Sequence, residues 1–137
     1  MERITRMKTK FKLGVIGCVV AIIILTILEF PAPIGFETRP QDNVSMGWLF
    51  FFLTIVSTEI ATIPLILKKQ KLGSIFGIVA GVLNILQVIA DQLHLMQPEV
   101  APLRYTLLEY SVAFMSLMLI YFSFKLSKSH GENRQCF

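Results

Sequence analysis

Four long apolar runs, separated by short polar segments, constrain the fold of this chain more than any other feature of its sequence. The runs cover residues 13–30, 46–67, 72–95 and 103–126. About 20 residues of helix, rising 1.5 Å each, cross the roughly 30 Å of hydrocarbon in a bilayer. The chain is 54% hydrophobic and 16% charged, which leaves too few polar side chains to cover a water-soluble domain. The sequence therefore predicts an all-α, four-helix transmembrane bundle, a single domain over residues 1–137 with tails at 1–12 and 127–137.

The basic residues are distributed unevenly between the two ends of the predicted helices. Eleven of the 13 Lys and Arg residues lie within residues 1–12, 68–71 and 125–134, all on one side of a chain that crosses four times. Because cytoplasmic flanks are enriched in Lys and Arg, this predicts both termini in the cytoplasm (N-in/C-in). No small-residue cleavage site follows the first run, so we expect an uncleaved helix rather than a signal peptide. Short loops and the lack of a retention or transit signal favour a bacterial inner (plasma) membrane.

The charge and the cysteines argue against several classes of function. The net charge of +4 comes from residues beside apolar runs, which is typical of contact with a lipid bilayer rather than with nucleic acid. Cys18 and Cys136 form no Cys-x-x-Cys motif, so a disulfide scaffold or a thiol redox enzyme is not expected. No standard catalytic or phosphate-binding motif is present. The sequence therefore predicts neither a cofactor nor a metal site. It favours a binding protein over an enzyme.

Four acidic residues fall within or at the ends of the apolar runs, namely Glu29, Glu59, Asp91 and Glu109. An acid in a membrane helix costs about 2.5–3.5 kcal/mol at the bilayer centre, so each is a candidate functional residue. At 1.5 Å per residue, Glu59 lies within roughly 5 Å of the centre, and the other three lie about 8–12 Å toward the outer face. We expect the hydroxyls of Thr58 and Thr62 to donate hydrogen bonds to Glu59, beside a kink at Pro64. The charge state of Glu59 stays open.

The third run has two different halves on one face. At about 100° per residue its first half carries a stripe of small residues and its second half a polar stripe. The small residues are Gly73, Gly77 and Gly81, and the polar ones are Asn84, Gln87, Asp91 and His94. The glycines predict close helix packing, so the helices should diverge around an acidic polar pocket in the outer half. Asp91 and His94 alone are too few ligands to predict a metal site.

The neighbouring helices offer further side chains to this pocket. In the fourth run Tyr105, Glu109 and Ser116 share a face, and Thr26 and Glu29 end the first run. We expect these residues to close the pocket. Two simpler explanations stay open. Interhelical hydrogen bonding alone would account for Asn84 and Gln87. A position near the lipid headgroups would account for Glu29, Asp91 and Glu109.

The second and third runs together show a resemblance to a known family. The segment Ser57–Leu65 carries a glutamate in an apolar setting, followed by the basic turn Lys68–Lys71, the small-residue stretch Gly77–Asn84 and His94. This pattern resembles small DoxX-like membrane proteins, a resemblance that implies four transmembrane helices. Sterol-isomerase-type bundles are similar in architecture, and that analogy would have Glu59 and Asp91 bind a cationic amine or stabilise a carbocation.

Several functions remain compatible with the sequence. The convergence of acids favours the binding of a small amphipathic or cationic ligand, such as a lipid, a quinone or an amine. The alternatives are a proton- or cation-coupled small transporter, a lipid enzyme with Glu59, Asp91 or His94 as acid or base, and a non-catalytic subunit of a membrane complex. A homodimer is compatible with the glycine stripe.

Overall fold

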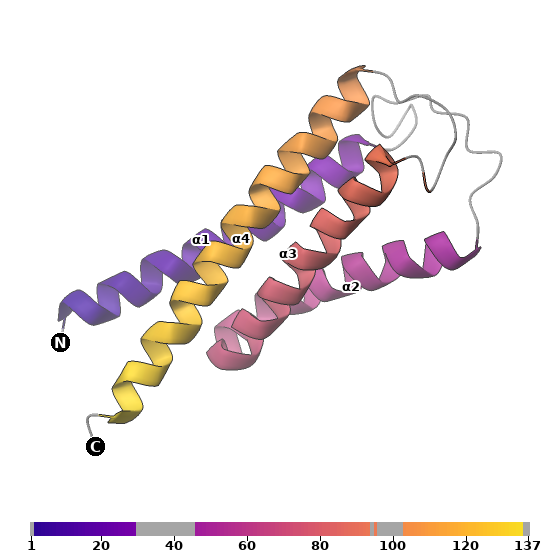
Figure 1. Ribbon diagram of the computed structural model, residues 1–137. Coiled ribbons are helices and arrows are strands. Elements are labelled where there is room, and N and C mark those ends of the chain that lie inside the picture. The colour runs from indigo at the N-terminus through magenta and orange to yellow at the C-terminus, as the bar shows by residue number, and fades with distance from the viewer. Residues whose placement is uncertain (1, 30–45, 94, 96–102, 136–137) are drawn as a thin grey trace.

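A computed structural model of the protein contains four helices and describes residues 2–29, 46–93, 95 and 103–135. The helices are α1 (Glu2–Leu28), α2 (Met46–Lys68), α3 (Gln70–Gln92) and α4 (Leu103–Gln135) (Figure 1). All four are long and apolar enough to cross a membrane. The predicted all-α, four-helix fold is therefore confirmed at this level.

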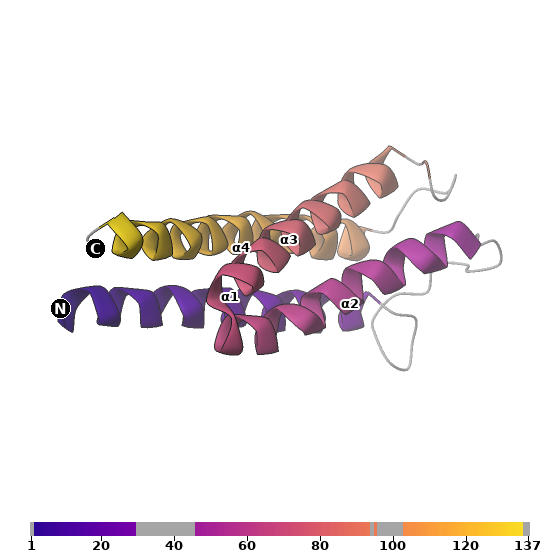
Figure 2. The same ribbon diagram turned by 90° about the horizontal axis from the view of Figure 1, so that it is seen from below.

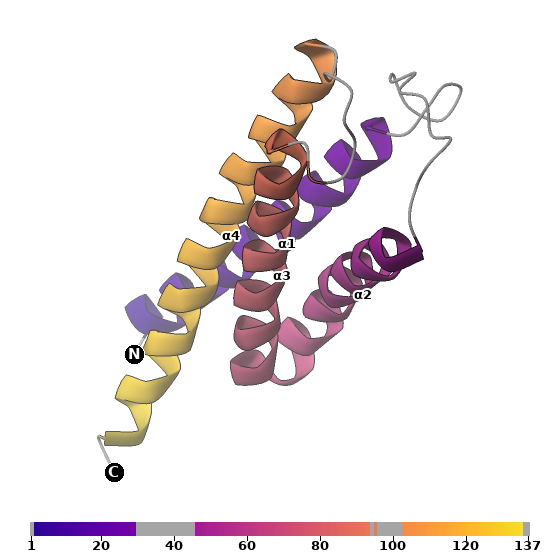
Figure 3. The same ribbon diagram turned by 45° about the vertical axis from the view of Figure 1, so that its right-hand side comes forward.

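The helices form two antiparallel pairs that pack together. The first pair is α1 with α4, and the second is the α2–α3 hairpin, which turns at Lys69. The most extensive packing joins the two pairs, between α3 and α4, and α1 makes a smaller contact with α2. The two termini and the α2–α3 turn lie at the same end of the bundle (Figure 1). Below we call this the basic end, because it carries the lysines of the α2–α3 turn. From there α2 and α3 diverge toward the opposite end (Figure 3).

The first and last helices, α1 and α4, are longer than their apolar runs. Residues 1–12 and 127–137 were expected to form tails, but α1 begins at Glu2 and α4 continues to Gln135. Both helices project beyond the α2–α3 turn at the basic end (Figure 2). Residues 2–12 contain neither proline nor glycine and are rich in Lys and Arg, which favour helix. Residues 127–135 contain no proline, so nothing in them forces α4 to end. α3 is shifted toward the same end, because it starts at Gln70 and ends at Gln92 rather than spanning 72–95.

The core of the bundle is formed by small and branched apolar side chains. Val15, Val19 and Ile22 of α1 are fully buried in one cluster with Leu119 of α4 and Ile66 of α2. Large apolar side chains on the outer faces stay exposed, among them Val20, Leu53, Val82 and Leu117. Such a surface would be unfavourable in water but suits contact with lipid.

The glycines of α3 lie where its backbone comes close to its neighbours. A Cβ atom at Gly81 would lie 2.6 Å from Cγ1 of Ile120 and 2.9 Å from the backbone oxygen of Ser116 on α4. At Gly77 it would meet the Ser123 side chain of α4, and at Gly73 the backbone of α2 at Ile66. The glycine face therefore holds α3 against two helices rather than one.

Pro64 lies within α2 without ending it. The region after α1, which includes the proline-rich loop of residues 31–45, lies outside the described residues.

Candidate functional site

A buried polar contact joins α2 to α3. Nδ2 of Asn84 donates a hydrogen bond to Oε1 of Glu59 at 2.6 Å and a second to the backbone oxygen of Ala80 at 3.0 Å. Both side chains are almost completely buried. Asn84 thus uses both of its amide hydrogens, and the carboxyl group of Glu59 receives a donor where water would otherwise be needed.

The threonines near Glu59 do not supply the donors expected from the sequence. The hydroxyl of Thr62 donates to the backbone oxygen of Thr58 at 2.7 Å, and that of Thr58 donates to the oxygen of Ile55 at 2.7 Å. The expectation is wrong because a helical threonine readily reaches the carbonyl three or four residues back, whereas a partner across the bundle must lie on the facing helix. Thr62 is fully buried one turn from Glu59, but it turns its donor to its own helix.

A second polar cluster joins three helices at the end opposite the α2–α3 turn. It contains Glu29 at the end of α1, Asp91 and Gln92 near the end of α3, and Glu109 in the second turn of α4. Gln92 Nε2 donates to Glu109 Oε2 at 2.5 Å, and the carboxyl groups of Asp91 and Glu109 are hydrogen-bonded to each other. We call these four residues the acidic cluster.

Two carboxyl groups of the acidic cluster are in direct contact. Asp91 and Glu109 are both buried, and a carboxylate only accepts hydrogen bonds. Two adjacent negative charges away from water are costly. A positive charge beside this pair would offset the repulsion between the two carboxyl groups.

Glu29 completes the cluster from a helix end. It directly follows the membrane-spanning part of α1, which ends at Leu28. Burial, and to a smaller extent the negative charge of Asp91, raises the pKa of the Glu29 carboxyl from its ordinary value of 4.5 to about 8. Its Oε1 atom is buried and has no hydrogen-bond partner among the described residues. Glu29 therefore offers an acceptor that the described part of the protein leaves unused.

The other residues expected at the site have different surroundings. Ser116 is buried, but its hydroxyl donates to the backbone oxygen of Val112 at 2.7 Å. Gln87, Tyr105 and Thr26 are half-buried, while His94 lies outside the described residues. Among the residues that the structure describes, no group of three His, Cys, Asp or Glu side chains is arranged to hold a metal ion.

Gln92 was not expected from the sequence. It follows Asp91 directly and falls off the stripe that runs from Asn84 to His94. The signal that could have indicated it was the need of Glu109 for a donor on a facing helix, since a buried carboxyl group is rarely left without one.

The two polar contacts lie at different depths. Asn84 and Asp91 are seven residues apart on α3, which is about 10 Å along the helix axis. The four acids expected in a single pocket are therefore divided between two places. Glu59 pairs with Asn84, and the other three belong to the acidic cluster near the helix ends.

Comparison with protein-family models, with curated proteins and with solved structures gives no match to this chain. What the protein does must therefore be inferred from its own residues.

Proposed function

We propose that this protein is an integral membrane protein of a bacterial inner membrane, with both termini cytoplasmic, that binds a small amphipathic amine at the acidic cluster. The orientation is supported by eleven of 13 basic residues on one side of the predicted helices, and by the position of both termini and the α2–α3 turn at one end of the bundle (Figure 1). The proposal includes a relationship to DoxX-like membrane proteins, which the sequence pattern of α2 and α3 resembles.

The observation that carries the proposal is the contact between the carboxyl groups of Asp91 and Glu109, on two helices. Glu29 lies at the end of a third helix, close enough to be affected by the charge of Asp91, and one of its oxygens is without a partner among the described residues. An alkylammonium group supplies three N–H donors to such acceptors, as a lysine head group does. Its alkyl chain lies favourably in the surrounding hydrocarbon.

The cluster also predicts that binding releases protons. An ammonium ion beside Glu29 and Glu109 favours their ionised forms, because an opposite charge within a few ångströms stabilises a carboxylate. Protons on these carboxyl groups would then be released. The deep Glu59–Asn84 pair lies about two helical turns away and serves to hold α2 on α3.

The test is calorimetric titration of octylamine into the protein in nanodiscs of uncharged lipid, with octanol as the neutral analogue and empty nanodiscs subtracted. We expect saturable binding of octylamine that the double variant Glu29→Gln, Glu109→Gln loses. Glu59→Gln is the matched control, because it neutralises the other buried acid while its amide oxygen can still accept from Asn84. Equal binding of octanol, or unchanged binding by the double variant, contradicts the proposal.

A second function, proton-coupled transport of the same amines, is favoured by the contact between the carboxyl groups of Asp91 and Glu109. A carboxyl pair that exchanges a proton for a cation has the chemistry that such coupling needs. Uptake of octylamine into liposomes that depends on a pH gradient, and is abolished by Glu109→Gln, would support transport. Saturable binding without such uptake would leave the protein as a binding module or as a subunit of a larger membrane complex.

A further inference from the structure

An open surface pocket of about 630 Å³ lies at the basic end, far from the acidic cluster. Its lining comes from α1 and from the turn between α2 and α3, namely Lys12, Leu67, Lys68, Lys69, Gln70, Lys71, Leu72 and Ile75. Cavities of roughly 300–1,000 Å³ are the usual size of small-ligand sites. We call it the basic pocket.

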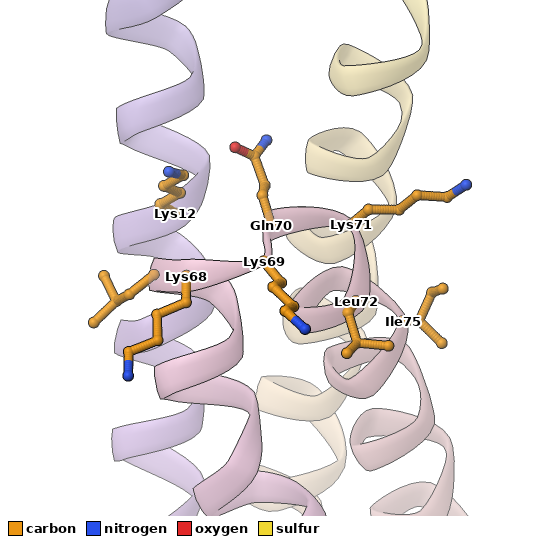
Figure 4. A pocket seen from close by; sticks show the side chains of 8 residues that line it. Lys12, Lys68, Lys69, Gln70, Lys71, Leu72 and Ile75 are labelled. Carbon is orange, nitrogen blue, oxygen red and sulfur yellow. The ribbon is translucent and has the colours of Figure 1, made fainter.

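The charges of the basic pocket have one sign. Four lysines line it and no acidic residue does. Figure 4 shows Lys12 on α1 beside the turn, and the side chains of Lys68, Lys69 and Lys71 spread around that turn in different directions. Four positive charges around one space repel one another, and an anion between them would offset that repulsion.

Lys12 distinguishes the pocket from an ordinary run of surface lysines. It belongs to a helix more than 50 residues away in the chain, and its side chain is half-buried. The basic turn alone would be explained by solvation and by membrane orientation. A lysine from α1 in the same cavity places positive charge on two sides of one space.

Two uncharged polar features add hydrogen-bond donors. Lys69, which precedes α3, makes no capping hydrogen bond with its side chain, and the first N–H groups of a helix have no partner within the helix. The Nε2 atom of Gln70 has no hydrogen-bond partner among the described residues. Both features suit the oxygens of a phosphate group.

The rest of the lining is apolar and exposed. Leu67, Leu72 and Ile75 are each more than a third exposed beside the lysines, and they belong to the membrane-spanning parts of α2 and α3. A soluble phosphate would not contact such a surface, whereas the acyl chains of a lipid would lie along it. Basic pockets between membrane helices are a recognised mode of binding for anionic head groups.

We propose that the basic pocket binds the phosphate head group of an anionic membrane lipid, between Lys12 on α1 and the lysines around the α2–α3 turn, with the lipid's acyl chain along Leu67, Leu72 and Ile75. This site is independent of the acidic cluster, which takes a ligand of the opposite charge at the other end of the bundle.

The test is native mass spectrometry of the full chain in a nonionic detergent, titrated with phosphatidylglycerol. The pocket variant combines Lys68→Gln, Lys69→Gln and Lys71→Gln, and the matched control combines Lys8→Gln, Lys10→Gln and Lys128→Gln, which removes the same charge outside the lining. Since each lysine near a membrane surface contributes several-fold to the binding of anionic lipid, we expect the pocket variant to lose about tenfold or more in affinity. The control should bind as the wild type does. A second pocket variant with arginine at the same three positions should retain binding, which separates loss of charge from loss of fold.

Two further arms identify the source of the phosphate. Phosphatidylcholine should bind weakly, and glycerol phosphate at the same concentration should not displace phosphatidylglycerol. Equal losses in the pocket and control variants would overturn the proposal, because they would show a general attraction of the basic end for anions. Displacement by glycerol phosphate would overturn the assignment to a lipid.

Discussion

The hydrogen bond between Asn84 and Glu59 should contribute measurably to the stability of the bundle. Replacing Asn84 with leucine keeps the side chain large but removes the donor, so Glu59 Oε1 stays buried without the partner that it has at 2.6 Å. Leaving a buried acceptor unsatisfied costs about 1–3 kcal/mol, and more when the group is charged. Hydrogen bonds between membrane helices average about 0.6 kcal/mol and reach about 1.7. The short distance and the almost complete burial of both groups place this bond near the top of that range, so we expect a coupling of about 1–2 kcal/mol.

The coupling is measured with a double-mutant cycle of Asn84→Leu and Glu59→Leu. Unfolding can be followed in mixed micelles with increasing sodium dodecyl sulfate, using the fluorescence of Trp48, the single tryptophan. The double variant should lose less stability than the sum of the two single variants, because the second substitution removes the carboxyl group that the first left unpaired.

A parallel cycle of Thr62→Val and Glu59→Leu is the control. The hydroxyl of Thr62 donates to the backbone of its own helix, so these two changes should be additive within about 0.5 kcal/mol. A coupling below about 0.3 kcal/mol for Asn84 and Glu59 would refute the reasoning. A larger coupling of Glu59 with Thr62 than with Asn84 would also refute it. That result would support the hydrogen bond from Thr62 to Glu59 that the sequence predicts.

Two further predictions concern packing and pH. Gly81→Ala should destabilise the bundle by about 1–3 kcal/mol through overpacking, because its Cβ would lie 2.6 Å from Cγ1 of Ile120. Gly17→Ala is the control, because its Cβ meets nothing within 4 Å. In the same unfolding assay, Gly17→Ala should leave the stability unchanged or raise it. Octylamine should bind about tenfold more weakly at pH 7 than at pH 9, because a carboxyl group with a pKa of about 8 is mostly protonated at pH 7 and mostly ionised at pH 9, while the amine stays charged at both. Glu29→Gln should flatten this dependence, and a pH profile that the variant shares with the wild type would count against a role for Glu29.

Part of the candidate site could be predicted from α3 alone. The helical period of 100° puts Asn84 and Asp91 on one face, and the cost of burying polar groups in lipid directs that face toward other helices. The structure buries both residues and gives each a carboxyl group as neighbour. The period of one helix contains no information about which residue of another helix lies opposite. The sequence therefore does not predict the contact of Gln92 with Glu109, and it wrongly predicts that Thr58 and Thr62 donate to Glu59.

Four apolar helices of membrane-spanning length follow from the order of residues along the chain. The reason is local chemistry, because a backbone in hydrocarbon must satisfy its own hydrogen bonds and does so most simply as a helix. The pairing of Glu59 with Asn84, and of Asp91 with Glu109 near the end of α1, is visible only once the helices are packed together. These contacts depend on the rotation and the crossing of whole helices, which the packing of Gly77 and Gly81 against α4 sets across many residues at once.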